Sequence, residues 1–229
     1  AFLNNKINYL VIPEGIKTLG ARSFRHNQLT QAVIPNSVTS NGTCAYCNNP
    51  IPNPSFLYYK NSSGVYDYSR IRGYMGDLTE FPDKVFRIPE TMVDEEGNTI
   101  PLKRIESSAF YSMSLTEWEV TIPDTVTYIG SSAFSACGIG KINIPSNAVT
   151  IGGSAFYNNR IRELHIPNTV TSIGELAFNT NYVSDLEQAW IYKRTSSGID
   201  YSTIIGYAGL NRNNVVIPAE KNGVALKTI

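Results

Sequence analysis

The sequence predicts a β-rich solenoid, in which short coils of chain stack on one another along one axis. Pro123, Pro145 and Pro167 recur at one constant interval. The same interval separates three glycines and three phenylalanines: Gly130, Gly152, Gly174, Phe134, Phe156 and Phe178. A fixed period of this size is typical of solenoids, because each unit buries its apolar face only against its neighbours.

Each unit is expected to open with a short strand that ends at the proline. Val120 and Ile122 alternate with polar neighbours such as Thr121, which is the period of a strand with one buried face. Proline cannot donate to a sheet, so the strand should stop there. Apolar residues then follow three and six positions after the proline, and the glycine after them should allow a positive φ or a close backbone approach. Around each Ala-Phe pair we expect a single short helical turn, with the ring in the interior.

A polar column is also expected inside the stack. Asn159 and Asn181 stand at the same distance after their prolines, and Cys137 takes the equivalent place in the preceding unit. A buried amide can bond the backbone groups that each coil leaves open where it turns. We therefore expect these side chains to be structural.

Two segments interrupt the repeat and resemble each other. Tyr59-Lys60 and Gly73-Tyr74 are echoed by Tyr192-Lys193 and Gly206-Tyr207, both pairs at the same offset along the chain. Each segment has a Ser-Ser-Gly turn between tyrosine-rich runs, which indicates a β-hairpin, and the later Asn222-Gly223 is a second hairpin signal.

The predicted organisation is therefore a single array over residues 1–229. It has regular repeats over 1–54, a hairpin island and return over 55–108, regular repeats over 109–185, and a second hairpin island and return over 186–229. Ala1-Phe2 corresponds to Ser23-Phe24 without its preceding strand, so we interpret the chain as a fragment of a longer array.

Residues 166–178, Ile-Pro-Asn-Thr-Val-Thr-Ser-Ile-Gly-Glu-Leu-Ala-Phe, closely resemble the BspA-like leucine-rich repeat family of bacterial surface and secreted proteins. The resemblance covers the regular repeats, more than half of the chain. It implies a right-handed, β-rich leucine-rich-repeat solenoid and a secreted or cell-surface location. The short helical turns and the two β-hairpin islands come from the residue patterns described above. The motif is specific for architecture and nearly silent about function.

Composition narrows the classes of partner. The 19 basic and 19 acidic residues balance to a formal charge of zero, which argues against a nucleic-acid ligand. No apolar run approaches the roughly 18 residues that a membrane-spanning helix requires, so membrane insertion is not expected. Only 17% of residues are charged, whereas 14 are tyrosine, which suits a β-rich secreted protein.

No catalytic, cofactor or metal site is expected. Cys44 and Cys47 have the spacing of a redox pair but no βαβ context, so they are interpreted as incidental thiols or a surface disulfide. His26 and His165 lie more than five units apart and cannot share a metal or a triad. The acidic run 94–98 lacks the ligand spacing of an EF-hand loop and is interpreted as a solvated turn.

The candidate binding surface has two parts, the outer faces of the strands and the tyrosines of the islands. Its residues are Tyr9, Gln31, Glu119, Lys141, Glu163, Asn143, His165, Tyr59, Tyr66, Tyr68, Tyr192 and Tyr201. Tyrosine offers a large contact area at a low entropic cost, although these rings could equally cover the flank of the solenoid.

The family resemblance, together with the absence of a catalytic constellation in the sequence, predicts a non-enzymatic extracellular binding or adhesion module that contacts a protein or glycan ligand. The alternatives are a structural spacer or stalk, and a substrate-binding appendage of a secreted hydrolase. Apolar coil edges are also expected to permit end-to-end self-association.

Overall fold

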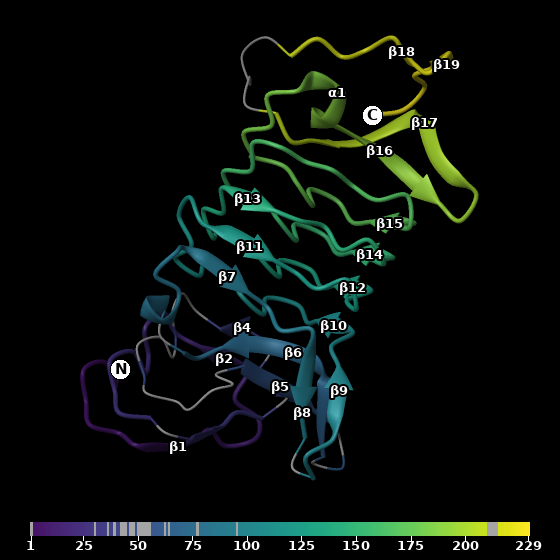
Figure 1. Cartoon of the computed structure of the whole chain (residues 1–229). Helices are drawn as coiled ribbons and strands as arrows, with labels where there is room; N and C mark the ends of the chain where they lie inside the picture. Colours follow the sequence, from purple (N-terminus) through teal and green to yellow (C-terminus); the bar gives the residue numbers. More distant parts are fainter. Residues whose placement is uncertain are drawn as a thin grey trace.

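In the middle of the molecule, over residues 96–183, successive turns of chain lie over one another (Figure 1). The computed structural model describes residues 2–29, 31–35, 37–38, 40–41, 45, 49, 56–61, 63, 65–76, 78–94, 96–209 and 215–229. Cys44, Cys47 and Glu95 lie outside the described residues.

Two parallel ladders run along the central coils, on opposite flanks of the stack (Figure 1). The first ladder contains β7 (Val85–Arg87), β11 (Glu119–Thr121) and β13 (Lys141–Ile142). The second contains β10 (Arg104–Ile105), β12 (Tyr128–Ile129), β14 (Thr150–Ile151) and β15 (Ser172–Ile173). Glu119 pairs with Lys141 and Ile129 with Ile151, so equivalent residues of neighbouring units lie side by side.

The ladders differ from the expected strands at two points. The second ladder is built from residues after the proline, where no strand was predicted. Residues 163–165, where a strand was expected, form none. The Leu164 N–H donates instead to the side chain of Gln188 at 3.3 Å, because the chain beyond this unit leaves the repeat.

The phenylalanines stack in single file, as predicted. The ring centroids of Phe134 and Phe156 are 5.4 Å apart with planes at 4°, and those of Phe156 and Phe178 are 5.2 Å apart at 10°. Phe110 extends the column 4.9 Å from Phe134. This column and the isoleucines beside it form one continuous core, which the described coils of this region share.

The asparagine column is confirmed too. Asn159 donates to the carbonyls of Phe134 and Phe156 at 2.8 and 3.0 Å and accepts from the Ile139 N–H at 3.0 Å. Asn181 makes the equivalent three bonds one coil later. Each amide therefore joins two coils through backbone groups that would otherwise be buried without a partner.

The turns between the ladders are not helical, which corrects the prediction of short helical turns. Ser132 and Ala136 have φ of 55° and 59°, and this left-handed conformation ends each hydrogen-bonded turn before a helix can form. Gly152 owes its identity to close approach, since a Cβ there would lie 2.4 Å from the backbone nitrogen of Ser131. Within the described residues the helices are α1 (Leu186–Ala189) and a 3₁₀ turn, η1 (Leu78–Glu80).

The first coils form a smaller stack with a core of its own. Here β1 (Tyr9–Val11) pairs with β3 (Gln31–Val33), and β2 (Thr18–Leu19) pairs with β4 (Ser40–Asn41), both in parallel. Phe2 stacks on Phe24 at 5.2 Å, and Asn27 and Asn49 bond backbone groups of the adjacent coil.

Two antiparallel pairs interrupt the coils. We call β5 (Phe56–Lys60) with β6 (Tyr66–Tyr74) the first ribbon, and β16 (Trp190–Thr195) with β17 (Gly198–Tyr207) the second ribbon. Each is followed by a smaller antiparallel pair: β8 (Thr91–Val93) with β9 (Thr99–Pro101), and β18 (Glu220–Lys221) with β19 (Val224–Ala225).

An arginine fixes each ribbon to the coil before it. Arg72 of β6 is buried and donates to three carbonyls, those of Ile34 (3.3 Å), Pro35 (3.0 Å) and Val38 (2.9 Å). Arg194 of β16 donates to the carbonyls of Ile166 (3.1 Å), Pro167 (2.7 Å) and Val170 (3.4 Å). The two guanidinium groups satisfy the same turn of the repeat where the next regular coil is missing.

Candidate functional site

A groove of about 780 Å³ is lined by the first ribbon and by the β8–β9 pair, and we call it the first groove. Three of the tyrosines selected from the sequence, Tyr59, Tyr66 and Tyr68, lie in its wall. The ribbon places them there because its two strands pair so that Tyr59 lies opposite Asp67 and Lys60 opposite Tyr66.

The rings of the first groove pack on one another. Tyr68 lies 4.6 Å from Tyr58 and 6.0 Å from Tyr66 between ring centroids. The Tyr58 hydroxyl donates to the sulfur of Met92 in β8, and burial raises the pKa of Tyr58 to about 12. This neutral phenol ties the ribbon to β8, so the aromatic wall is fixed before any ligand arrives.

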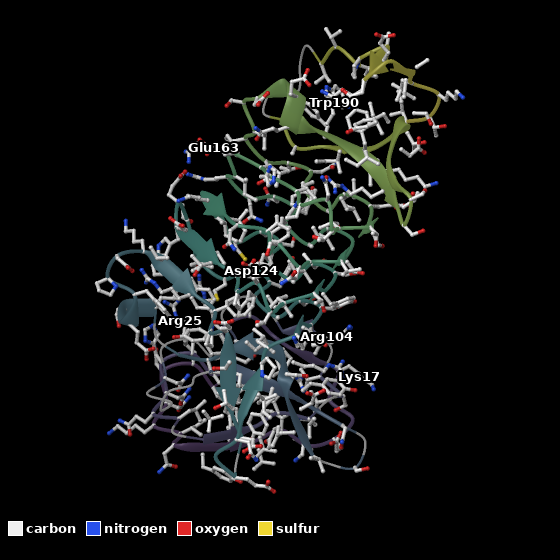
Figure 2. The ribbon with its side chains drawn as sticks, turned by 45° about the vertical axis from the view of Figure 1, so that its right-hand side comes forward. Lys17, Arg25, Arg104, Asp124, Glu163 and Trp190 are labelled. Carbon is white, nitrogen blue, oxygen red and sulfur yellow. The ribbon has the colours of Figure 1, made fainter. Side chains whose placement is uncertain are left out.

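A row of alternating aromatic and charged side chains runs from the first groove across β6, β10 and β12. The guanidinium of Arg70 lies 3.6 Å from the ring centroid of Tyr59, and that of Arg104 lies 3.7 Å from Tyr128. Glu106 joins them, since one of its oxygens accepts from Arg70 Nε at 2.8 Å and from Arg104 Nε at 3.2 Å. The bond to Glu106 raises the pKa of Arg70. This row holds Tyr59 in place; Arg104 marks it in Figure 2.

Carboxylates complete the first groove. Asp67 accepts from the N–H and hydroxyl of Ser69 at 3.1 and 2.6 Å. Asp94 and Glu96, from the turn between β8 and β9, stand on the other wall. A bond from the Asn98 side chain keeps the pKa of Asp94 below its usual range, so this group remains charged.

The second ribbon forms a smaller groove, of about 190 Å³, which we call the second groove. Tyr192 and Tyr201 meet edge to face at 5.3 Å in its wall, with His165 of the preceding coil. Figure 2 shows Trp190, another wall residue, at the second ribbon. Tyr192 is only 8% exposed, so it forms the floor and offers little surface to a ligand, contrary to its selection as a contact residue.

The strand-face candidates lie apart from the first groove. Lys141 pairs with Glu119 at 3.0 Å, and Asn143 uses its amide to bind both backbone groups of Ile122, at 2.9 and 2.8 Å. Glu163 is exposed on the flank away from Arg104 (Figure 2).

The remaining candidates of the strand faces differ in their surroundings. Tyr9 is 54% exposed on β1, whereas the side chain of Gln31 lies outside the described residues. His165 lines the second groove.

One charged cluster was missed. Glu117 accepts from Arg160 at 3.1 Å and from Arg162 at 2.6 Å, and these bonds lower the pKa of Glu117 to about 2. Arg160 and Arg162 flank the buried Ile161 in the sequence, but nothing in the repeat connects them to Glu117.

Other chemistry has little support among the described residues. The Cys137 thiol donates to the Phe110 carbonyl at 3.0 Å, and burial raises its pKa to about 12, so its structural role is confirmed. The described residues contain no group of three or more histidine, cysteine, aspartate or glutamate side chains able to hold a metal. Over the same part of the chain, no helix has the length and apolar character needed to cross a membrane.

A protein-family model described as the BspA type leucine rich repeat region matches residues 1–68 and 102–208, in six copies. No curated protein matches the chain.

Among solved structures, a leucine-rich repeat protein from Bacteroides capillosus ATCC 29799 is 24% identical with a TM-score of 0.48, over 59% of this chain and 94% of that chain. A leucine rich cell surface protein from Faecalibacterium prausnitzii A2-165 is 25% identical with a TM-score of 0.42, over 75% of this chain and 51% of that chain. A leucine rich repeat protein from T. pallidum is 21% identical with a TM-score of 0.37, over 56% of this chain and 65% of that chain.

Proposed function

Because the chain belongs to the BspA-type leucine-rich repeat family, we propose that it is a non-enzymatic binding or adhesion module, secreted or displayed at a cell surface. It acts through contacts with a protein or glycan ligand. In this proposal residues 1–229 form one right-handed solenoid array, and the two ribbons are hairpin islands that carry the contacts.

The observation that carries the proposal is the repetition of an aromatic groove. Tyr59 and Tyr68 in the first groove correspond to Tyr192 and Tyr201 in the second, at the same offset along the chain. Tyr59, Tyr68 and Tyr201 are partly exposed, and Tyr192 supports Tyr201 from the floor of the second groove. Partly exposed tyrosines beside charged groups are typical of recognition surfaces. A ligand that reaches both grooves would bind more tightly than it binds either one alone, because its second contact is intramolecular.

A spacer would not need these features. The phenylalanine and asparagine columns are sufficient to stack coils, and they contain no tyrosine. The ribbons, by contrast, hold Tyr59, Tyr66 and Tyr201 at partly exposed positions. These residues favour a binding module over a stalk.

The test is capture of ligands by the purified 229-residue chain. It is applied to a glycan array and to immobilised extracellular matrix proteins, beside a variant with Tyr59, Tyr66 and Tyr201 changed to alanine. The matched control replaces three exposed tyrosines of the coils with alanine: Tyr111, Tyr157 and Tyr182.

We expect the chain and the control to capture the same ligand, and the ribbon variant to lose at least tenfold in apparent affinity. Such a loss corresponds to about 1.4 kcal/mol, which a few buried aromatic contacts readily supply. Capture of nothing by the intact chain would support the stalk instead. Equal losses in both variants would move the binding surface away from the ribbons.

A further inference from the structure

The first groove brings tyrosine rings and carboxylates together in one open space. Tyr66 and Tyr68 are inclined to each other at 51° with centroids 6.0 Å apart. Val65, beside Tyr66, is 60% exposed, so this end of the aromatic wall opens to solvent. A ring at such an edge can receive an apolar ligand face without movement of the backbone.

The carboxylates on the other wall are held in fixed directions. Asp94 accepts from the N–H groups of Glu96 and Asn98 at 3.0 and 2.8 Å and from the Asn98 amide at 2.9 Å. Glu96 accepts from the same amide at 3.3 Å. An ionised carboxylate has about four acceptor positions, so both groups can accept further hydrogen bonds from a ligand.

Side chains form the surface of the first groove. β5 pairs with β6 and β8 with β9 along their inner edges, and the turn of the ribbon closes through Asn61 N–H to the Val65 carbonyl at 2.8 Å. The tyrosine rings and the charged groups of these strands line the space between them. The contacts proposed for this groove are therefore made by side chains.

The charges of the groove disfavour a polyanion. Lys60 and Arg70 face three carboxylates, those of Asp67, Asp94 and Glu96, and Arg70 is already paired with Glu106. A sulfated or sialylated chain would meet like charge on the β8–β9 wall.

Building on the binding function proposed above, we propose that the first groove binds a neutral saccharide. The C–H face of one pyranose lies on Tyr66, and its hydroxyl groups donate to Asp94 and Glu96. A sugar ring has both an apolar face and an edge of donors, which matches an aromatic wall opposite fixed acceptors.

The test uses saturation-transfer NMR and calorimetry on the intact chain. The probes are four neutral hexasaccharides (cellohexaose, maltohexaose, mannohexaose and xylohexaose) and a heparin-derived hexasaccharide. We expect at least one neutral probe to bind, with transfer strongest at its ring C–H protons, and the heparin probe to bind more weakly.

Variants localise the interaction. Tyr66→Ala should weaken the binding of the neutral probe about tenfold, whereas Tyr66→Phe should stay within about twofold because the ring is kept. Glu96→Gln should weaken it about threefold to tenfold, since a charge-assisted hydrogen bond becomes a neutral one. Tyr157→Ala, at an exposed tyrosine of a coil, should change nothing.

The saccharide proposal is overturned if no neutral probe binds, if heparin binds best, or if Tyr66→Ala binds as well as the intact chain. Capture of a matrix protein alongside any of these results leaves the general binding function standing. Failure of both experiments removes both proposals.

Discussion

The regular coils and the two ribbons satisfy the same need, partners for backbone groups at each turn, with different side chains. In the coils, Asn159 and Asn181 make identical bonds at identical repeat positions. At the ribbons, Arg72 and Arg194 reach equivalent carbonyls from non-equivalent strands, β6 and β16. Both cases require a hydrogen-bond donor at a given place beside the turn. In the coils this donor always comes from the same repeat position, because each coil stacks on an equivalent coil; at the ribbons it comes from different positions.

This difference separates stability from recognition. A coil residue that must match its neighbours above and below is constrained by both, so the coils are uniform. In the first ribbon, Arg70 and Ile71 of β6 still pair with β10. Tyr59 and Tyr66, by contrast, pair within the ribbon and can face a ligand. Substitutions in the coils should therefore lower the stability of the fold, whereas substitutions on the ribbon surface should change it little.

The largest effect is expected at the centre of the phenylalanine column. Phe156→Ala removes a fully buried ring stacked on both sides and should lower the free energy of unfolding by about 3–5 kcal/mol, as for other buried phenylalanines. Urea denaturation followed by circular dichroism measures this loss.

Tyr66→Ala in the first ribbon is the matched comparison and should cost about 1 kcal/mol or less, because the ring is partly exposed. If the two substitutions cost the same, the proposed division between stable coils and tolerant ribbon surface is wrong.

The next largest loss of stability is expected at the arginines that fix the ribbons to the coils. Arg72→Met removes the arginine donor from the carbonyls of Ile34 and Val38 and should cost about 3 kcal/mol; the Pro35 carbonyl keeps its bond from the Val38 N–H. Arg194→Met, at a less buried site, should cost about 1–2 kcal/mol. Burial also lowers the pKa of Arg194, consistent with its partial removal from water. The same denaturation series gives both values, and a larger loss at Arg194 would contradict the role assigned to burial.

Much of the fold could be predicted because a strict sequence period indicates coils of equal length that stack with equivalent residues in contact. Phe134 and Phe156, one period apart, must lie over each other if every coil is alike, and they do. The second ladder was missed because strands such as Thr150–Ile151 are too short to show an alternation. The left-handed turns were missed because Ser132 and Ala136 have a positive φ although neither is glycine or asparagine, the residues that usually signal this conformation.

The site was only partly readable from sequence. The tyrosines of the ribbons could be selected by composition, but Tyr192 turned out to be a floor residue because packing decides exposure. Arg72 and Arg194 could not be matched, since they do not share a position in the longer repeat that relates the two ribbons. Glu117 was equally hidden, because its partners lie 43 and 45 residues away.

A smaller effect contrasts two asparagines of the coils. Asn159→Ala leaves the buried Phe134 carbonyl and Ile139 N–H without their partner, while the Phe156 carbonyl keeps its bond from Asn181, and it should cost about 2 kcal/mol. Asn143→Ala should cost about 0.5–1 kcal/mol, because water can replace its exposed amide. Comparable losses at the two sites would mean that the buried column has no special role in joining coils.

The smallest effect concerns charge on the coil surface and depends on pH. Bonds from Arg162 and Arg160 lower the pKa of Glu117 from 4.5 to about 2 in the folded chain. A lowered pKa means that the unfolded chain takes up the proton first, so this stabilisation is present above pH 4.5 and is lost as the pH falls towards 2. Glu117→Gln should therefore be less stable than the intact chain at pH 6, and the two should converge at low pH. Raising the salt concentration at pH 6 should narrow the same gap, because exposed ion pairs are screened. A stability difference that stays constant from pH 6 to pH 2 would show that Glu117 acts through packing and not through its charge.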